Sequence, residues 1–468
     1  MSTTMSSSPS SSRSPRTSPR RRDGGSHTGS FHVTTLGCPK NQVDSDKLTG
    51  TLQADGLTAA ASVEDADLVV VNTCAFIDAA REESVEAILA AAGARRDGAR
   101  LVVTGCLAER YGDELAAELP EVDLVAGFGQ SVNLLAPNAG AVDPAPEGVA
   151  VTIGARPAAR SAAVPDFDLL NLPRPASEVP WAYVKVAEGC DRACGFCAIP
   201  SFRGPQRSRS IDTILAEVDQ LAAQEIVLVA QDLASFGRDQ GRGERSIVPL
   251  VQAVAARVPR TRLLYLYPSD LTDALVDAVL ATGVPYFDLS LQHVSRPLVR
   301  RMRRWGDGER FLDRIADIRA QAPDAAFRSN FIVGYPGETE ADHDALLQFV
   351  AEAQVDWCGF FRYSAEEGTY AYDLDGQVPP ALVEERMAEL TELQDEITAR
   401  KRDEMLGARV EVLVDSPGVG RTHREAPEID GVVRVPPSLR PGSFHTLRVV
   451  GAAGPDLAAD LEREPGDP

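Results

Sequence analysis

The chain has no apolar run close to the roughly 18 residues that a membrane span requires. Residues 1–29 are rich in Ser, Pro and Arg, and they lack the apolar core of a secretory signal peptide. The seven cysteines are an odd number in a long chain without a secretion signal, which argues against a disulfide framework. We therefore expect a cytoplasmic protein with a disordered tail over residues 1–29 and with reduced cysteines that serve as ligands.

Positive charge is scarce in this chain, whose formal net charge is −22 and whose isoelectric point lies near 4.8. Such a surface disfavours non-specific contact with phosphate backbones and favours basic partners, although a local basic groove fits within a negative total. Residues 409–468 contain seven Arg, ten acidic residues and no Lys. We expect this last segment to meet a basic protein or a partly neutral surface rather than tRNA.

Three cysteines, Cys190, Cys194 and Cys197, form a C-x3-C-x2-C pattern, and no fourth cysteine lies nearby. A closed four-iron cluster needs four thiolates, so three of them leave one iron open for chemistry. The alternative is a zinc knuckle, which usually pairs two C-x2-C halves or adds a nearby histidine. The next histidine downstream is His293, so the pattern favours an iron–sulfur cluster.

Hydrophobic patterning divides the rest of the chain into four segments. Residues 30–139 alternate short apolar runs with helical patterns, which predicts an α/β domain with a parallel sheet. A linker rich in Pro and Ala follows over 140–175. Six larger βα repeats over 176–405 predict a barrel or partial barrel, whose chemistry lies at the carboxyl ends of its strands. Short β-type runs over 406–468 predict a small β-barrel and a tail.

The expected strands are 31–36, 68–71 and 101–104 in the first domain, then 182–186, 226–230, 262–267, 286–290, 327–333 and 356–362 in the central one, and 410–414, 431–435 and 445–449 at the end. The expected helices are 43–55, 79–92, 109–119, 211–224, 273–281, 308–322, 340–353 and 381–405.

Three further cysteines each follow one of the first three expected strands. They are Cys38, Cys74 and Cys106, which lie 36 and 32 residues apart. Because the carboxyl ends of parallel strands share one edge of a sheet, these thiols can converge on a second three-thiolate cluster. The alternative is three buried core cysteines, which are common. Cys358 lies in an apolar strand without a partner, and we expect it in the core.

The C-x3-C-x2-C loop, with Phe196 before its last cysteine, resembles the radical S-adenosylmethionine enzymes. Residues 331–339 resemble the strand and turn that line the nucleotide side of that family's site, and residues 229–232 end the second strand of the barrel, where the family places polar contacts to the methionine end. The cofactor contacts that this resemblance implies are Phe196, Gln231, Asp232, Arg328 and Gly334. Ordinary alternatives are an ion pair for Arg328 and a helix cap for Gln231 and Asp232.

The whole arrangement over 31–450 is similar to the methylthiotransferases, which join a three-cysteine domain, a radical barrel and a C-terminal TRAM barrel. The resemblance implies two [4Fe-4S] clusters and S-adenosylmethionine. The open iron of one cluster would bind S-adenosylmethionine, whose reductive cleavage gives a 5′-deoxyadenosyl radical that abstracts hydrogen from an unactivated carbon. The other cluster would hold the sulfur, and a second S-adenosylmethionine would supply the methyl group. A sulfur donor and an electron donor such as flavodoxin or ferredoxin are implied as partners.

Residues 36–45, LGCPKNQVDS, look like the branch that modifies an aspartate of small-subunit ribosomal protein twelve, free or in the subunit. The branch that modifies an isopentenyladenosine in tRNA typically has Gly-Cys-Gln-Met-Asn here. Residues 72–78 and 231–237 agree with the first branch, while Gln42 and Ala75 depart mildly from it. The resemblance implies a β-methylthio-aspartate product. The alternatives are the tRNA reaction and an adaptor whose cysteines hold a structural metal.

Residues 300–304 form a basic run, RRMRR, in this acidic protein. A solvated helix face is the default interpretation of such a run, and binding of an acidic partner or of the region around the substrate aspartate is the alternative.

Overall fold

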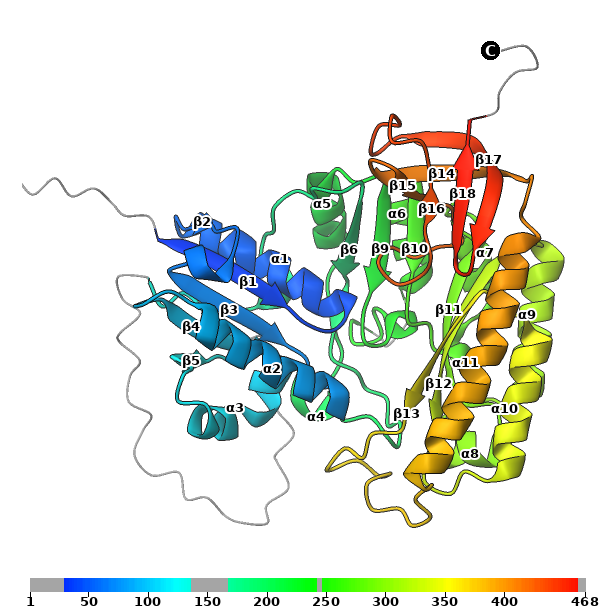
Figure 1. Cartoon of the computed structure of the whole chain (residues 1–468), viewed down its shortest axis with the longest axis horizontal. Coiled ribbons are helices and arrows are strands. Elements are labelled where there is room, and N and C mark those ends of the chain that lie inside the picture. The colour runs from blue at the N-terminus through cyan, green and yellow to red at the C-terminus, as the bar shows by residue number, and fades with distance from the viewer. Residues whose placement is uncertain (1–28, 136–166, 242–245, 462–468) are drawn as a thin grey trace, which may run out of the picture.

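The computed structural model describes residues 29–135, 167–241 and 246–461 (Figure 1). The tail predicted over residues 1–29 therefore lies outside the described residues except for Gly29, as do most of the linker predicted over 140–175 and the last seven residues. Within these described ranges, no helix is long and apolar enough to cross a membrane.

The first domain is a parallel sheet with helices on both faces, as the alternating pattern predicts. Its strand order is β2-β1-β3-β4-β5. The strands are β1 (Ser30–Thr35), β2 (Thr58–Ala59), β3 (Leu68–Thr73), β4 (Arg100–Gly105) and β5 (Leu124–Val125), and the helices are α1 (Pro39–Ala54), α2 (Asp78–Ala94) and α3 (Cys106–Glu118).

The packing of the central strand β3 explains why the strands of this domain have continuous apolar sequences. Val70 packs on one face with Leu48 and Leu52 of α1, and Val71 packs on the other face with Ile88 of α2. Strands that are covered on both faces have no polar side, so their sequences do not alternate. The parallel register places the ends of β1, β3 and β4 along one edge of the sheet.

The central domain is an open arc of six parallel strands. Three strands pair in the order β10-β9-β6 and three in the order β11-β12-β13, and a bridge between Leu266 and Leu289 connects the two sets. The strands at the two ends of the arc are β6 and β13. Within the described ranges, β6 pairs only with β9 in this arc and β13 only with β12, so the barrel is not closed. Of the two predicted options, the structure has the partial barrel. The strands of the arc are β6 (Trp181–Lys185), β9 (Glu225–Val229), β10 (Arg260–Leu263), β11 (Tyr286–Gln292), β12 (Ala326–Val333) and β13 (Trp357–Arg362).

Helices cover the outer face of the arc, and α11 (orange in Figure 1) leads from it to the last domain. They are α5 (Ile211–Leu221), α6 (Ile247–Ala255), α7 (Asp273–Leu280), α8 (Arg296–Arg301), α9 (Gly308–Gln321), α10 (Glu340–Ala353) and α11 (Pro380–Asp403). The short elements β7 (Ala187–Glu188), α4 (Ile199–Arg203) and β8 (Arg207–Ser208) surround the C-x3-C-x2-C loop.

The third strand of the arc is shorter than the predicted run over 262–267, because β10 ends at Leu263. Tyr265 follows with a φ of +65°, in the left-handed region that side chains other than glycine rarely adopt. Gln292, at the end of β11, has a φ of +71°. Such backbone conformations cost about 1–3 kcal/mol each and cluster at functional sites.

The last domain is a closed barrel in the order β14-β15-β16-β18-β17. Its strands are β14 (Arg409–Ser416), β15 (Val419–Arg421), β16 (Val433–Arg434), β17 (Phe444–Ala453) and β18 (Asp456–Asp460). The sequence missed β15 and β18, because the pattern of Gly and Ala residues in these short segments does not mark a strand. Closure of the barrel leaves no unpaired edge.

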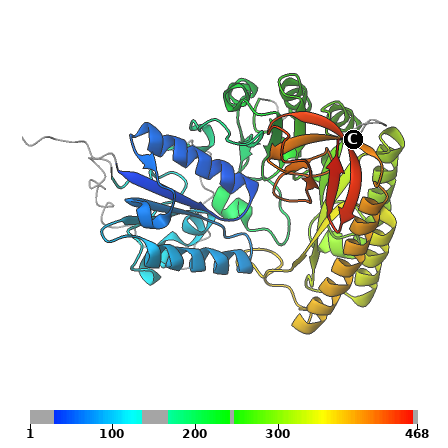
Figure 2. The same cartoon turned by 45° about the horizontal axis from the view of Figure 1, so that its top comes forward.

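The barrel sits at the amino ends of the central strands. Glu225, the first residue of β9, forms buried ion pairs with Arg262 at 2.7 Å and with Arg421 of the barrel at 3.0 Å. The hydroxyl of Tyr286, the first residue of β11, donates to Asp430 at 2.6 Å. Figure 2 shows the barrel (red) over one end of the central domain, with the first domain (blue) to one side. The barrel therefore lies opposite the carboxyl ends where the cysteines gather.

Candidate iron–sulfur and cofactor site

The C-x3-C-x2-C loop connects β7 to α4 and is fixed by backbone hydrogen bonds. Gly195 donates from its amide to the carbonyl of Met302 at 2.8 Å and accepts from the amide of Ala371 at 2.7 Å. Gly189 has a φ of +77°, and a Cβ there would lie 2.1 Å from the carbonyl oxygen of Pro205. Only glycine fits at this position, because any side chain would clash with the backbone that follows α4.

The thiols of this loop lie among groups that stabilise negative sulfur. Nη1 of Arg304 lies 3.2 Å from Sγ of Cys194, and the amide of Arg192 lies 3.4 Å from Sγ of Cys190. Burial raises the pKa of Cys190 and of Cys197 to about 12. These two thiols therefore favour the protonated form at neutral pH, and metal binding to Cys190 and Cys197 would release their protons.

The second set of cysteines converges at the edge of the first domain, as the strand-end argument predicts. Cys38 precedes the first turn of α1, Cys74 follows β3, and Cys106 is the first residue of α3. Asn41 holds the edge together, because its Nδ2 donates to the carbonyls of Leu36 and Thr73, both at 2.9 Å. A side chain at Gly37 would clash with Sγ of Cys74, since a Cβ there lies 2.9 Å from it.

The Cys38 thiol differs from its two partners in its electrostatic surroundings. Burial raises its pKa, but the positive charges of Lys40 and Arg203 outweigh this and hold the pKa below its usual value. Burial raises the pKa of Cys74 to about 12 and that of Cys106 above its ordinary value. Cys38 is therefore the thiol of this set that most readily becomes a thiolate.

Each set of thiols is close enough for its members to influence one another. Besides burial, Cys106 and Cys38 raise the pKa of Cys74, and Cys194 and Cys190 raise that of Cys197. In residues 29–135, 167–241 and 246–461, no three His, Cys, Asp or Glu side chains are grouped closely enough to hold a metal ion. In a cluster the thiolates bind separate iron atoms, so two sets of three thiols fit that donor chemistry. The assignment of these cysteines as ligands stays a prediction.

Two predicted cofactor contacts, Gln231 and Asp232, lie at the carboxyl end of β9 beside the loop. Nε2 of Gln231 donates to Glu188 at 2.7 Å, and Oδ2 of Asp232 accepts from Nε of Arg192 at 2.5 Å. Oε1 of Gln231 and Oδ1 of Asp232 are buried and have no hydrogen-bond partner among the described residues. Because an unpaired buried acceptor costs about 1–3 kcal/mol, this pair suits a ligand that brings N–H donors, such as the amino group of S-adenosylmethionine.

The other three predicted contacts have structural partners. Phe196 packs beside the buried Met302 and Tyr335. Arg328 forms ion pairs with Asp288 at 3.3 Å and with Asp430 at 3.4 Å, which is the ordinary alternative considered for it.

Gly334 has a φ of +81°, and the group that approaches it is a side chain of this protein. A Cβ there would lie 2.6 Å from Cγ2 of Val383 in α11. Its amide donates to Oε2 of Glu338 at 2.6 Å. Contact of Phe196, Arg328 and Gly334 with S-adenosylmethionine stays a prediction.

The solvated face expected for the basic run over 300–304 is wrong for two of its residues. Arg304 is half-buried and reaches Cys194, and Arg301 donates to the carbonyl of Asp375 at 3.0 Å. Arg300 and Arg303 are exposed, the latter with its guanidinium 3.8 Å from the centroid of the Tyr370 ring. The sequence of the basic run predicts a helix that continues past Arg301, but helix α8 ends at that residue. The chain then turns back towards the cysteine loop.

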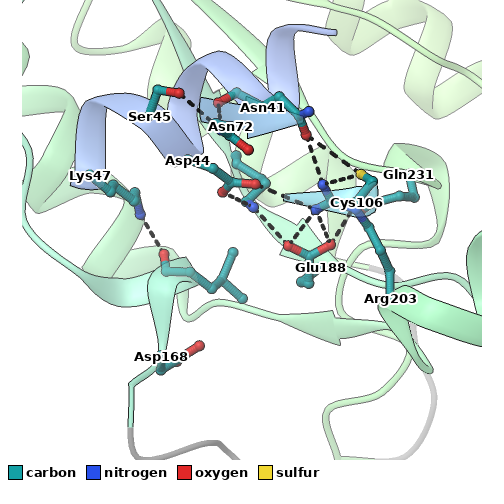
Figure 3. Close-up of polar contacts among 12 residues, drawn as sticks. Asn41, Asp44, Ser45, Lys47, Asn72, Cys106, Asp168, Glu188, Arg203 and Gln231 are labelled. Carbon is teal, nitrogen blue, oxygen red and sulfur yellow. Dashed lines mark hydrogen bonds and ion pairs between the residues drawn. The ribbon is translucent and has the colours of Figure 1, made fainter. Parts of the chain in front are cut away.

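The sequence also gave no sign of Arg203, which follows the cysteine loop at the end of α4. Its Nη2 lies 3.0 Å from Sγ of Cys106 in the other domain (Figure 3). Cys358 lies on β13, half-buried, and packs against the main core, as expected.

Models of three protein families match the chain in the order of its domains. The uncharacterized protein family UPF0004 matches residues 30–127, the radical SAM superfamily matches 184–350, and the TRAM domain matches 406–461.

Curated relatives match over almost the whole chain. The ribosomal protein uS12 methylthiotransferase RimO of Frankia casuarinae is 41% identical, with 92% of each chain covered. RimO of Kineococcus radiotolerans is 40% identical over 92% of this chain and 97% of its own. The chain belongs to the RimO family. It is a radical S-adenosylmethionine methylthiotransferase, as predicted, and the superfamily implies a [4Fe-4S] cluster and S-adenosylmethionine.

RimO membership agrees with the predicted fold class, in which a parallel α/β domain, a partial radical barrel and a TRAM barrel follow one another. Among solved structures, the radical S-adenosylmethionine methyltransferase TsrM from Kitasatospora setae matches at 13% identity with a TM-score of 0.45, over 83% of this chain and 76% of its own. The domain boundaries at 139, 175 and 405 stay predictions.

Proposed function

We propose that this protein methylthiolates the β-carbon of an aspartate in small-subunit ribosomal protein twelve, uS12. The observation that carries the proposal is the identity of about 40%, over nine tenths of the chain, with relatives named as uS12 methylthiotransferases. The reaction would use two S-adenosylmethionine molecules, a sulfur donor and an electron donor such as flavodoxin or ferredoxin. The cytoplasm is the compartment in which ribosomal proteins meet such donors.

We assign one predicted cluster to each cysteine set. Cys190, Cys194 and Cys197 would hold the superfamily's [4Fe-4S] cluster, and Cys38, Cys74 and Cys106 would hold a second one that presents sulfur. When bound, the first group supplies the electron that cleaves S-adenosylmethionine and so generates the radical.

The protein's own side chains bind and orient in this proposal. Oε1 of Gln231 and Oδ1 of Asp232, which have no partner in the part of the chain that the structure describes, would accept from the amino end of S-adenosylmethionine. Arg192 fixes Asp232 and also bonds Oγ of Ser235 at 3.0 Å, which keeps this carboxylate aimed at the loop. Side chains that are already held in place lose little conformational entropy when the ligand binds.

Lys40 is the feature that supports an acidic substrate. It is half-buried two residues after Cys38, and its ammonium lies 3.6 Å from the centroid of the Tyr265 ring. In the described part of the chain, no carboxylate pairs with this ammonium. A half-buried cation that stabilises the Cys38 thiolate, and that pairs with no carboxylate of the described residues, suits the carboxylate of an aspartate better than a neutral adenine ring.

The TRAM barrel favours a protein over tRNA as the substrate. Two of its arginines are used internally, because Arg421 pairs with Asp415 at 2.6 Å and Arg434 with Asp456 at 3.7 Å. The barrel has no lysine, and it lies at the amino ends of the central strands, opposite the cysteines. A barrel that grips tRNA would present free cations to the phosphates.

The deciding experiment is mass spectrometry of uS12 and of tRNA nucleosides from a strain that lacks this gene. We expect the methylthio group to disappear from uS12 alone and to return when the gene is restored. Its loss from tRNA, with uS12 unchanged, would replace the proposed substrate with the adenosine.

A further inference from the structure

Arg203 connects the two cysteine sets from a buried position between the domains. It ends α4, directly after the C-x3-C-x2-C loop, and its side chain is 3% exposed. Nη2 donates to Sγ of Cys106 at 3.0 Å and to Oδ1 of Asn41 at 2.8 Å, while Nη1 donates to Oε1 of Glu188 at 2.8 Å (Figure 3). One guanidinium therefore bonds a predicted sulfur ligand of the first domain and a carboxylate of the second.

Glu188 is the opposing charge in this contact. It lies two residues before Cys190 and accepts from Arg203, from Nζ of Lys185 at 2.7 Å and from Nε2 of Gln231 at 2.7 Å. Lys185 also pairs with the buried Asp44 of α1. The charges of two cations, Arg203 and Lys185, are thus balanced by two carboxylates. When Cys106 binds iron, its sulfur becomes a further negative group in contact with Arg203.

We propose that Arg203 is a positioning residue that sets the reduction potential of the N-terminal cluster, the one predicted on Cys38, Cys74 and Cys106. The carboxylate of Glu188 partly offsets the positive charge of Arg203. Reduction adds negative charge to a cluster, and hydrogen bonds and cations at its sulfurs make that charge easier to accept. The contact is buried, so water and salt screen it little. The inference rests on the proposed function, because it requires Cys38, Cys74 and Cys106 to hold a cluster.

The potential of the sulfur site then depends on a residue that belongs to the other domain. The sulfur site reaches its working potential only when α4 is docked against α3, since that docking brings the guanidinium to Cys106. A sulfur centre that is reduced before the domains are in place would react with solvent species instead of the substrate radical.

A separate interdomain contact provides a matched control. Glu366, 2% exposed in the loop after β13, accepts from Arg81 of α2 at 2.7 Å and from Arg110 of α3 at 2.5 Å. It fastens the same two domains, and within the described residues it makes no hydrogen bond to a cysteine. A substitution that removes this contact shows how weaker docking of the two domains by itself affects the reduction potential and the thermal midpoint.

The test uses the full chain with Cys190, Cys194 and Cys197 changed to Ala, so that only the N-terminal set can bind iron. The midpoint potential is measured by redox titration with electron paramagnetic resonance, and the thermal midpoint is measured on the same samples. We expect R203Q to shift the potential negative and E188Q to shift it positive. R203K should stay near the parent potential but lower the thermal midpoint, because a lysine keeps the charge and cannot reach all three acceptors.

E366Q should lower the thermal midpoint and leave the potential unchanged. Equal shifts in R203Q and E366Q, or no shift in R203Q and E188Q, would overturn the inference. If R203Q does not fold, the sign of the E188Q shift decides the question. E188Q leaves the charge of Arg203 uncompensated and should make reduction easier. Looser docking would instead move Arg203 away from Cys106 and make reduction harder. A parent protein that binds no iron after reconstitution would contradict the proposed second cluster itself, whereas iron with an unmoved potential removes only the role of Arg203.

Discussion

The ammonium of Lys40 lies 3.6 Å from the centroid of the Tyr265 ring, so a cation from the first domain rests on an aromatic side chain from the second. Tyr265 has a strained, positive φ, and Cys38 contributes to raising the pKa of its hydroxyl, after burial as the larger cause. Lys40 lies two residues after Cys38, so a substrate that bound its ammonium would lie beside the predicted N-terminal cluster. The strained backbone of Tyr265, and an ammonium that pairs with no carboxylate of the described residues, are features that we expect of a carboxylate-binding position.

The first prediction concerns this lysine. K40M should lower kcat/KM for methylthiolation of uS12 by about 10- to 100-fold, because a charge-assisted hydrogen bond contributes about 1.5–3 kcal/mol. K40R should recover part of the loss. The product is measured by mass spectrometry in anaerobic assays with reconstituted enzyme. A uS12 with Asn in place of the target Asp tests the assignment, because its penalty should not add to that of K40M. Fully additive penalties would place Lys40 elsewhere.

The second prediction concerns the division of labour between the cysteine sets. We expect Cys194→Ala to abolish cleavage of S-adenosylmethionine, and Cys74→Ala to leave cleavage active while stopping sulfur insertion. The two thiols belong to separate domains and separate sets. Production of 5′-deoxyadenosine and of methylthiolated uS12 is followed in the same reaction. Normal methylthiolation by the Cys74→Ala enzyme would show that the N-terminal set does not supply sulfur. Cys358→Ala, in the core, is the control.

The third prediction concerns the attachment of the TRAM barrel through Glu225. Burial raises its pKa, but Arg262 and Arg421 outweigh this and lower it to about 2. E225Q leaves these two buried guanidinium groups without their shared carboxylate, so we expect a loss of about 3–5 kcal/mol of stability. Urea denaturation measures the loss, and limited proteolysis between α11 and β14 should release the barrel faster.

The matched control for this prediction is Glu384→Gln, which removes the exposed ion pair between Glu384 and Arg362. Exposed pairs of this kind contribute little, so the variant should unfold like the parent protein. A similar response in both variants would mean that the buried pair does not hold the barrel in place.

The fourth prediction is a pH dependence that arises from His293. Its side chain is fully buried, Nδ1 accepts from the amide of Ser295 at 3.1 Å, and Nε2 has no partner within residues 29–135, 167–241 and 246–461. Burial lowers its pKa to about 4, below the value of about 6.5 for an unfolded chain. The unfolded state therefore binds more protons between these values, and stability falls as the pH drops through this window.

H293Q should remove that slope. Between pH 7 and pH 5 the parent protein should lose up to about 2 kcal/mol more than the variant, and urea denaturation at both pH values measures the difference. Parallel losses in the two proteins would mean that His293 does not titrate within this range.

Local patterns in the chain were enough to predict most of the architecture. Continuous apolar runs marked β3 and β4 as strands covered on both faces, and the ends of these strands placed Cys74 and Cys106 at one edge. The spacing of Cys190, Cys194 and Cys197 predicted a loop of cluster ligands. These features are local in sequence, so spacing and periodicity carry them.

Only the tertiary structure decided which side chains act together. Arg203 and Cys106 are 97 residues apart, and Lys40 and Tyr265 belong to different domains, so no local pattern connects them. The arc of the central strands stayed undecided between a closed and an open barrel, because closure depends on pairing between its first and last strands. The sequence by itself determined where the cysteines lie along the chain, and so which of them we predict as cluster ligands. The packing of one domain against the other decided which charges face that cluster, because buried ion pairs form only where distant segments meet.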